Sequence, residues 1–282
     1  MDKNIEINKS SAEKWFRALR DKICNEFQEL EISFSNKNSL NPSRFHRKSW
    51  KRPGGGGGVI SLMRGNLFEK VGVNISTVHG VLPIDFRASI PGAEKNGKFW
   101  ASGISLVSHP LNPYIPSAHL NTRLIHTSKT WFGGGGDITP MLPSILISNN
   151  FHNAFKKTCD KHDPNYYDKF KLWADEYFFI KHRGEARGDG GIFFDNLNTD
   201  NWENDFSFVK DVGKTFLEIY STIISQTMNK KWSKKDREKQ LLKRGRYVEF
   251  NLVYDRGTLF GLKTDGNIEA ILMSLPPEVK WL

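Results

Sequence analysis

The sequence predicts an α+β protein built around a large, mostly antiparallel sheet. Helical patterns lie at the beginning and in the middle of the chain, and strand-like segments lie between them without the regular alternation of βαβ units. The chain has 282 residues, of which 38% are hydrophobic and 12% aromatic, so it can bury a substantial core. Because no repeat or linker interrupts it, we expect a single domain over residues 1–282.

The first expected element is an amphipathic helix over about residues 10–31. Ser10 and Glu13 have the spacing of a capping box, and apolar residues recur at helical spacing through the segment. The polar and basic stretch 36–52 predicts a loop. Over residues 59–100, short apolar runs broken by glycine predict strands.

Two further strands are predicted where polar and apolar residues alternate with period two. In the segment ISLVSH, Ser105 and His109 lie on one face. In the segment HLNTRLI, His119, Asn121 and Arg123 lie on one face, and leucine and threonine lie on the other. The link between the two segments contains three prolines, which indicates a rigid connection rather than a helix.

Helices are predicted over residues 149–161 and 163–181, and the second begins at an Asp163-Pro164 pair suited to the N-cap and first helical positions. The glycine-broken segment HRGEARGDGG predicts a polar loop that leads to a strand, GIFFDNL. Apolar residues at helical spacing predict another helix over residues 206–228.

The last part of the chain is expected to contain one short basic helix followed by strands. Ser233 is the expected N-cap of the helix, and Gly245 is expected to end it. The segments RYVEFNLVYDRGTLFGL and NIEAILMSL are predicted to be strands joined by a short turn around Asp265 and Gly266.

Composition limits the classes of partner and the compartment. Lys and Arg outnumber Asp and Glu by 41 to 31, which favours an anionic partner: nucleic acid, a membrane surface or a polyacidic small molecule. The two cysteines, Cys24 and Cys159, are too far apart for a CxxC site and indicate a reducing compartment. No apolar segment approaches the roughly 20 residues that span a bilayer, and the first residues lack a signal-peptide core. We therefore expect a cytoplasmic protein without an integral membrane segment.

Two glycine runs, RPGGGGGV and WFGGGGDITP, raise the question of a phosphate-binding loop. A Walker A loop requires Lys and then Ser or Thr after its last glycine, whereas Asp137 and Ile138 follow the second run. A flexible linker would have polar flanks, whereas Trp131 and Phe132 precede this run. We interpret WFGGGGDITP as an ordered turn whose backbone can approach a ligand closely.

The face that carries His119, Asn121 and Arg123 offers an imidazole, an amide and a guanidinium fork, which suit a carboxylate substrate. An ordinary solvated strand face is the alternative. Asp195 ends an apolar run and Asp255 precedes Arg256. Either aspartate is a candidate base with a raised pKa, or else an ion-pair partner or turn cap.

Two other patterns have a less specific interpretation. His109, His119, His152 and His182 are candidate metal ligands, but they show neither HxxxH nor HExxH spacing. The basic segment 229–246 surrounds a tryptophan and could bind nucleic acid, although a solvated basic helix is the commoner outcome of such a pattern.

Several long segments together resemble the oxygen-dependent coproporphyrinogen III oxidases. They occur in the order of that family between about Trp50 and Trp281: GGGGG, LFEKVGVNISTVHG, SLVSHPLNPYIPSAHLNTR, WFGGGGDITP, FFIKHRGEARGDGGIFFDNL, RGRYVEFNLVYDRGTLFGL and ILMSLPP. The resemblance implies a flat sheet of about seven strands covered by helices on both faces, in a homodimer. It also implies oxidative decarboxylation of the two propionates on rings A and B of coproporphyrinogen III to vinyl groups, which yields protoporphyrinogen IX, CO₂ and hydrogen peroxide in haem biosynthesis.

The resemblance further implies O₂ as co-substrate, no organic cofactor, and roles for individual residues. His119 resembles the proton donor, and Asp195 and Asp255 resemble the carboxylates of which one orients a pyrrole N–H. Arg256 completes the family's DRG motif. The residues that resemble substrate contacts are Ser105, Asn121, Arg123, Gly266 and Asn267. The four histidines His109, His119, His152 and His182 resemble proposed ligands of a divalent metal, and their spacing does not decide whether the reaction uses one.

The chain departs from the pattern of this family at a few positions. Gly184 stands where Asn is usual, and Asp189 stands where an apolar residue is usual. The turn Asp265-Gly266-Asn267 replaces a common Gly-Gly-Arg, so one propionate contact is lost or supplied by Lys263 instead. We expect these departures to affect substrate affinity more than the class of reaction.

Overall fold

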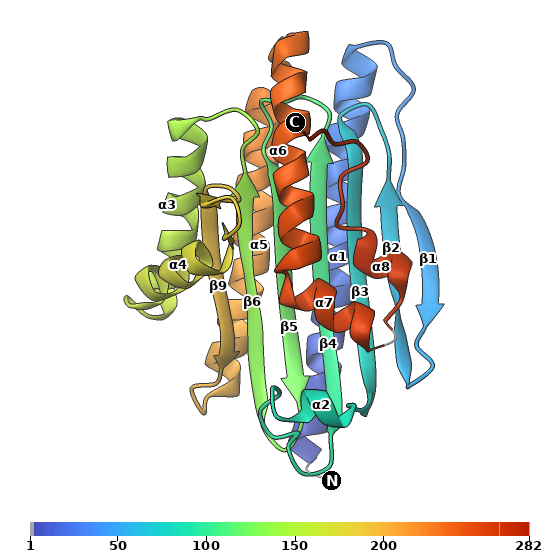
Figure 1. Ribbon diagram of the computed structural model, residues 1–282, viewed down its shortest axis with the longest axis vertical. Helices are drawn as coiled ribbons and strands as arrows, with labels where there is room; N and C mark the ends of the chain where they lie inside the picture. The colour runs from blue at the N-terminus through green and yellow to red at the C-terminus, as the bar shows by residue number, and fades with distance from the viewer. Residues whose placement is uncertain (1–2, 265, 282) are drawn as a thin grey trace.

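The computed structural model describes residues 3–264 and 266–281. Seven antiparallel strands form one sheet in the order β1-β2-β3-β4-β5-β6-β9, which confirms the predicted α+β class (Figure 1). The strands are β1 (His46–Lys51), β2 (Gly56–Met63), β3 (Phe68–Val81), β4 (Lys98–Pro110), β5 (Ser117–His126), β6 (Thr130–Thr139) and β9 (Gly190–Leu197), and a separate hairpin consists of β7 (Phe179–Ile180) and β8 (Glu185–Ala186).

The helices lie before, between and after these strands. They are α1 (Lys3–Lys37), α2 (Ile84–Arg87), α3 (Ile145–His162), α4 (Tyr166–Tyr177), α5 (Trp202–Thr227), α6 (Lys234–Val253), α7 (Arg256–Lys263) and α8 (Ile268–Leu272). Within this described part of the chain, no helix is both long enough and apolar enough to cross a membrane.

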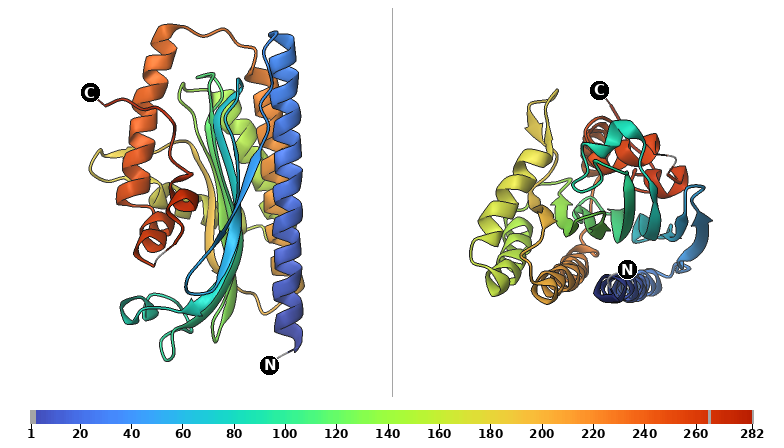
Figure 2. Two further views of the ribbon diagram at one scale, coloured as in Figure 1. Left: turned by 90° about the vertical axis from the view of Figure 1, so that its right-hand side faces the viewer. Right: turned by 90° about the horizontal axis from the view of Figure 1, so that it is seen from below.

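The sheet separates two layers of helices (Figure 2). On one face, which we call the helix face, α1 and α5 run along the strands and α3 packs beside α5. On the other face, which we call the site face, α6, α7 and α8 cover the middle of the sheet. Alternation along each strand decides which side chains each layer receives.

The helix face holds the main core. Leu120 and Leu124 of β5 are fully buried there, as the period-two pattern predicts. Phe16 and Phe27 of α1 are equally buried, and the Phe27 ring stacks on that of Phe68 at a centroid distance of 5.1 Å. Each such side chain contributes about 1.5–3 kcal/mol of transfer free energy when fully buried, so this layer holds the sheet rigid behind the site face.

The predicted strands ISLVSH, HLNTRLI and GIFFDNL lie in β4, β5 and β9, and the helices expected over 149–161 and 206–228 are α3 and α5. The predicted start of the first helix was wrong. Its first turn lies at Lys3, so Ser10 and Glu13 occupy the interior of α1 rather than a capping box. The stretch 36–52 is also not entirely loop, because β1 pairs with β2 there.

The helix after the Asp163-Pro164 pair begins later than predicted. Asn165 occupies the N-cap position of α4, and Asp163 instead caps α3 and accepts a hydrogen bond from the Asn165 amide at 2.7 Å. The expected polar loop after α4 contains the β7–β8 hairpin.

The C-terminal strands were predicted wrongly, since this region is helical. The N-cap at Ser233 is confirmed, with a full capping box to Asp236, but α6 continues through Gly245 to Val253. A Cβ at Gly245 would lie 2.5 Å from the Lys280 carbonyl oxygen, so this glycine admits the C-terminal segment rather than ending the helix. Helical spacing buries Tyr247 and Phe250, and this packing overrides their preference for strands.

The short helices α7 and α8 begin at polar N-caps. Asp255 accepts from the Thr258 amide, and Asn267 accepts from the Ala270 amide. The turn predicted around Asp265 lies outside the described residues, whereas Gly266 donates its amide to the Gly261 carbonyl at 2.9 Å.

Candidate active site

The second glycine run lies inside the sheet and is not the turn that we predicted. WFGGGGDITP forms β6, which pairs with β5 on one side and β9 on the other. Most of its backbone amides therefore serve the sheet rather than a ligand. The first run likewise enters the sheet, because Gly56–Gly58 begin β2.

Alternate glycines of β6 serve the two faces of the sheet. On the helix face, a Cβ at Gly136 would lie 3.0 Å from the Phe155 ring and 3.1 Å from the Phe216 ring. On the site face, a Cβ at Gly133 would lie 2.5 Å from Asp195 Oδ1 and 2.8 Å from Arg123 Cζ. The missing side chains thus let two helices approach one face and let two polar side chains meet across the other.

The two side chains that meet over Gly133 are Arg123 of β5 and Asp195 of β9. Their Nη2 and Oδ2 atoms are 3.0 Å apart, and about a quarter of each side chain is exposed. Arg123 Nη1 also donates to Asn121 Oδ1 at 2.9 Å. The guanidinium is therefore held in a fixed plane with donors left for a further ligand.

The next pair along the site face joins His119 to Asp137. Strand register places the two residues opposite each other, and His119 Nδ1 lies 2.9 Å from Asp137 Oδ1. Because a carboxylate only accepts, Nδ1 carries the proton in this pair. Among the described residues, Nε2 of this imidazole has no hydrogen-bond partner and a quarter of the side chain is exposed, so it is available to a ligand.

Arg187 supplies the counter-charge of this pair. Its guanidinium contacts Asp137 Oδ2, and both side chains are almost completely buried. It also lies over the ring of Phe178, with Cζ 4.0 Å from the centroid, and over those of Tyr247 and Phe250. Burial alone would raise the pKa of Asp137, but the Arg187 charge and the hydrogen bond from His119 outweigh it and lower that pKa. Asp137 is thus an ionised anchor for the imidazole.

Asp255 and Arg256 lie at the same face but are held differently from Asp195. Asp255 accepts from the amide and hydroxyl of Thr258, both at 2.7 Å, and from Tyr177 Oη at 2.8 Å. Burial and the nearby Asp255 carboxylate raise the pKa of Tyr177, which keeps its hydroxyl a donor. Arg256 lies over the Tyr177 ring at 5.0 Å and over Phe193 of β9 at 5.7 Å.

The remaining predicted contacts occupy separate places. Ser105 stands opposite Asn121 in the register of β4 and β5, and among the described residues its hydroxyl has no partner. Asn267 uses its side chain to cap α8, and Gly266 lies in the turn before it. The structure therefore brings together Ser105, His119, Asn121, Arg123 and Asp195 on one face of β4, β5 and β9, with β6 between the last two strands.

The four candidate metal histidines are held apart. His109 is fully buried between the Ser117 hydroxyl and the Ser274 carbonyl, at 3.0 and 2.8 Å. His152 contacts the Tyr167 hydroxyl and the Asp189 carbonyl, and His182 contacts Glu249 and the Tyr254 hydroxyl. No group of three metal-ligating side chains occurs among residues 3–264 and 266–281.

Sequence reasoning missed Asp137, Arg187 and Tyr177. Asp137 has the same strand parity as Gly133, so the period-two rule places it on the site face once the run is known to be a strand. Its position opposite His119 depends on register, and Arg187 reaches it from a hairpin 50 residues later. No local pattern indicates either contact.

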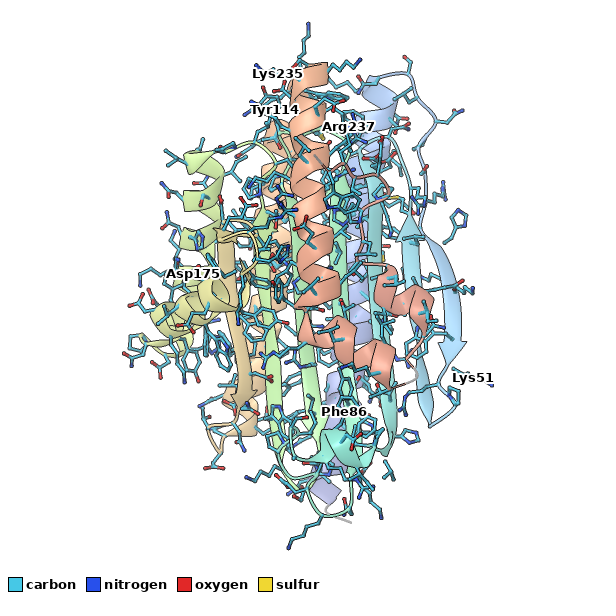
Figure 3. All side chains as sticks on the ribbon, viewed as in Figure 1. Lys51, Phe86, Tyr114, Asp175, Lys235 and Arg237 are labelled. Carbon is cyan, nitrogen blue, oxygen red and sulfur yellow. The ribbon has the colours of Figure 1, made fainter. Side chains whose placement is uncertain are left out.

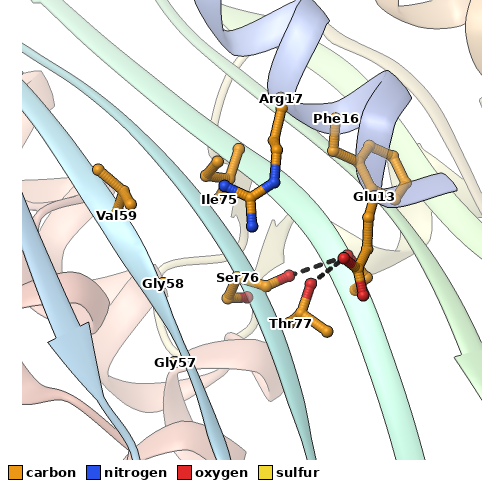
Figure 4. A pocket seen from close by; sticks show the side chains of 10 residues that line it. Glu13, Phe16, Arg17, Gly57, Gly58, Val59, Ile75, Ser76 and Thr77 are labelled. Atoms are coloured by element: carbon orange, nitrogen blue, oxygen red, sulfur yellow. Dashed lines mark hydrogen bonds between the residues drawn. The ribbon is translucent and has the colours of Figure 1, made fainter. Parts of the chain in front are cut away.

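A pocket with a volume of about 190 Å³ lies on the other face of the sheet, between α1 and the first strands (Figure 4). Glu13 and Arg17 project into it above Ser76 and Thr77, and the Ser102 hydroxyl bonds the Thr77 hydroxyl and the Ser76 carbonyl. Since His119 and Arg123 project to the opposite face, this pocket is separate from the candidate site.

The basic segment 229–246 is exposed over residues 229–235, whereas its later part turns inward. Lys235 and Arg237 lie at one end of the molecule, opposite the end that carries Phe86 (Figure 3). Arg237 pairs with Glu69 and Glu278, and the fully buried Arg244 also pairs with Glu69. These arginines fix α6 to β3, which weakens the nucleic-acid interpretation.

The departures Gly184 and Asp189 lie near the hairpin and α3. Gly184 has a φ of +65°, and a Cβ there would meet nothing within 4 Å. Burial raises the pKa of Asp189, whose carbonyl accepts from His152 Nε2 at 2.9 Å. Within the part of the chain that the structure describes, neither residue contacts the site side chains on β4, β5 and β9.

Comparison with known proteins identifies the family. A family model described as Coproporphyrinogen III oxidase matches residues 11–282. Proteins named oxygen-dependent coproporphyrinogen-III oxidase from Rickettsia rickettsii (strain Sheila Smith) and Rickettsia bellii (strain OSU 85-389) are each 58% identical to this chain, over 99% of both sequences. One of the same name from Rickettsia akari (strain Hartford) is 57% identical over 97% of this chain and 98% of its own length. The chain therefore belongs to the coproporphyrinogen III oxidase family.

Proposed function

We propose that this protein, an oxidoreductase by its family, removes the ring A and ring B propionates of coproporphyrinogen III as CO₂ and leaves vinyl groups, with O₂ as oxidant. The observation that carries the proposal is the site face, where an imidazole, an amide and a guanidinium project from one strand and the guanidinium meets the carboxylate of Asp195. A flat, tetracarboxylate substrate requires such a surface of cations and hydrogen-bond donors.

Arg123 and Asn121 bind a substrate propionate in this proposal. The guanidinium already contacts Asn121 and Asp195, so two of its donors are oriented before substrate arrives. Its remaining N–H groups and the hydroxyl of Ser105, which has no partner within residues 3–264 and 266–281, complete the carboxylate site. Gly266 and Asn267 contact the substrate from the α7–α8 turn.

Each decarboxylation transfers two electrons to O₂. The propionate β-carbon loses one proton together with two electrons, and the electrons of the bond to the carboxylate then form the vinyl double bond as CO₂ leaves. O₂ takes the two electrons, that proton and one further proton, and becomes hydrogen peroxide. His119 supplies the further proton from Nε2 when both of its ring nitrogens are protonated, while Asp137 holds its Nδ1–H.

A carboxylate orients the pyrrole N–H of the ring that is being oxidised. Asp195 suits this role because Arg123 and the Asn196 amide are its partners and a fifth of its side chain is exposed. Asp255 already accepts three hydrogen bonds at the start of α7. We therefore propose that it fixes the positions of Arg256 and of Tyr177, whose ring faces β9. The electrons come from the substrate, and the proposal includes no organic cofactor.

Replacing each aspartate by asparagine separates the two roles. We expect Asp195→Asn to lower kcat by roughly 100-fold, the size of a typical general acid–base contribution, with folding intact. Asp255→Asn should lower kcat less, because an asparagine can still cap α7, whereas Asp255→Ala should also lower the melting temperature, because the N-cap is then lost at a cost of about 1 kcal/mol. Normal turnover in both asparagine variants, with normal substrate binding, would contradict this assignment.

We also propose a homodimer in the cytoplasm, in which the whole chain acts as one coproporphyrinogen oxidase domain. The exposed apolar side chains of Val253, Leu262 and Ile268 on the α6–α8 layer support a partner there. Sedimentation velocity at micromolar concentration measures the oligomeric state. A monomer at every concentration would exclude the dimer without affecting the proposed chemistry.

The alternative function is tetrapyrrole binding without catalysis. It is separated from the enzyme by incubating the protein aerobically with coproporphyrinogen III and then identifying the oxidised porphyrins by chromatography and fluorescence. Protoporphyrin as product supports the enzyme. Tight binding with no conversion supports the binding protein, and the same assay with a chelator tests whether a divalent metal takes part.

A further inference from the structure

The buried guanidinium of Arg187 depends on the β7–β8 hairpin for its position. The hairpin pairs Phe179 with Ala186 and Ile180 with Glu185, and Arg187 follows it directly. The Arg187 amide then donates to the Phe178 carbonyl at 2.9 Å. Any displacement of this hairpin, whose strands have two residues each, therefore moves the residue that anchors Asp137.

Glu249 of α6 holds the tip of the hairpin. Arg183 donates to both of its carboxylate oxygens, from Nε and Nη2, each at 2.8 Å. His182 Nε2 donates to Oε2 at 2.7 Å. Arg246 at 3.2 Å and the Trp281 indole at 3.0 Å complete the set, so five donor atoms from the hairpin, α6 and the C-terminal segment converge on one side chain.

The carboxylate charge of Glu249 is central to this cluster. The hydrogen bond from Arg183 outweighs the effect of burial and, together with His182, lowers the pKa of Glu249 to about 2. Only 13% of the Glu249 side chain is exposed, against 39% for Arg183, so the acceptor is more sheltered than its donors. A second bond between the elements, Arg246 to Glu185 at 3.2 Å, reinforces the same contact.

We propose that Glu249 is a positioning residue for the reaction: by fixing the β7–β8 hairpin to α6, it keeps Arg187 against Asp137 and so keeps His119 oriented. Glu249 reaches neither the substrate nor His119 and acts only through this series of contacts. The inference rests on the proposed role of His119 as proton donor. A small displacement far from the reacting atoms is enough to slow an enzyme substantially.

A double-mutant cycle tests the connection between Glu249 and Arg187. Glu249→Gln should lower kcat roughly 10-fold, as expected for a lost alignment, and change KM by less than about twofold, since no substrate contact is removed. In an Arg187→Lys background the same change should lower kcat by less than about twofold, because residues that act through one another are not additive. The proposal would be overturned by an unchanged kcat in Glu249→Gln. It would also be overturned if the reductions in kcat caused by Glu249→Gln and Arg187→Lys multiplied in the double mutant.

Glu238→Gln is the matched control. Glu238 also lies on α6 and also contacts the C-terminal segment, through Lys280 at 2.6 Å, but in the described part of the chain it has no hydrogen bond or ion pair to the hairpin. This variant should retain wild-type kcat and KM, and the same loss as in Glu249→Gln would point to general damage to α6 instead. If Glu249→Gln does not fold, Arg183→Gln can replace it, because this change removes only the bidentate partner of Glu249. Its effect on kcat should likewise be smaller in the Arg187→Lys background.

A readout that does not need turnover separates this proposal from the role of His119. In ¹⁵N-histidine spectra recorded at a pH where the ring is neutral, with the His119 signal assigned from a His119→Asn variant, the wild type should show the Nδ1–H tautomer and Glu249→Gln a mixture of tautomers. An unchanged His119 signal would contradict the positioning role. Normal turnover of His119→Asn would instead refute the proton-donor role, and the spectra would still report whether Glu249 orients the ring.

Discussion

Asp137 has the most demanding environment of any acidic side chain at the site. It is fully buried, yet the buried Arg187 and the His119 imidazole keep it ionised. A buried charge of this kind is tolerated only with a well-placed partner. Asp137 and Arg187 therefore set the orientation of the His119 imidazole. Of these three side chains, His119 is the one that is partly exposed.

Replacing Asp137 by asparagine tests this arrangement. The variant leaves the buried Arg187 without a counter-charge, so the free energy of unfolding should fall by about 3–5 kcal/mol. Urea denaturation monitored by circular dichroism measures this loss. Arg123→Gln removes a more exposed ion pair, so it should lower the free energy of unfolding by less than about 1 kcal/mol while still impairing substrate binding. An equal loss of stability in the two variants would contradict the special role of the buried Asp137 charge.

The same contacts make the contribution of Asp137 to folding stability depend on pH. Its folded pKa lies below the unfolded value, so its contribution to stability is complete above about pH 4 and is lost as the pH falls through the folded pKa. Asp137→Asn should therefore show a smaller acid-induced loss of stability than the wild type below that pH. Equal acid dependence of the two proteins would indicate that the carboxylate is not held ionised.

Among the elements, β6 shows how one strand can serve both layers of the molecule. Gly133 clears the site face for the Arg123–Asp195 pair, and Gly136 admits the aromatic rings of Phe155 in α3 and Phe216 in α5. Substitution of a glycine on the site face should therefore affect activity, whereas substitution of a glycine on the helix face should affect stability.

Gly133→Ala should reduce kcat/KM at least 10-fold, because a misplaced binding group costs a factor of this order or more, with a small loss of stability. The added Cβ meets the ends of flexible side chains, Asp195 Oδ1 and Arg123 Cζ, which can move aside. Gly136→Ala meets two packed rings instead and should cost about 1–3 kcal/mol through overpacking, with kcat/KM retained in the folded fraction. Steady-state kinetics and thermal denaturation of the two variants distinguish the patterns, and similar effects in both would refute them.

At the scale of the whole molecule, the sheet isolates the site from the main core. The helix face supplies rigidity through α1, α3 and α5, while α6, α7 and α8 close over the site face. His109 joins this second layer to the sheet, since its ring bonds the Ser274 carbonyl and meets the Tyr247 ring edge-on at 5.1 Å. The layer that covers the site is thus held partly by a neutral histidine.

Protonation of His109 should destabilise the folded protein. Burial, aided by the nearby Arg244 charge, holds the pKa of His109 well below its usual value, so the unfolded chain binds this proton more readily. The free energy of unfolding should therefore fall as pH decreases below about 6.5, by up to about 1.4 kcal/mol per pH unit for one proton. Denaturation between pH 7.5 and 5 should show a shallower dependence in His109→Gln, and parallel slopes would disprove this origin.

The sequence by itself determined the family, the α+β class and the strand that carries His119, Asn121 and Arg123, because period-two alternation and long motifs are properties of contiguous residues. Only the tertiary structure decided that the glycine run is a central strand, since register and helix contacts give its glycines their two functions. It also decided that Asp137 and Arg187 complete the histidine site, because those contacts join distant segments. The segment RYVEFNLV became part of α6 because a stripe at helical spacing buries Tyr247 and Phe250 against the site face, and that burial outweighs local strand preference.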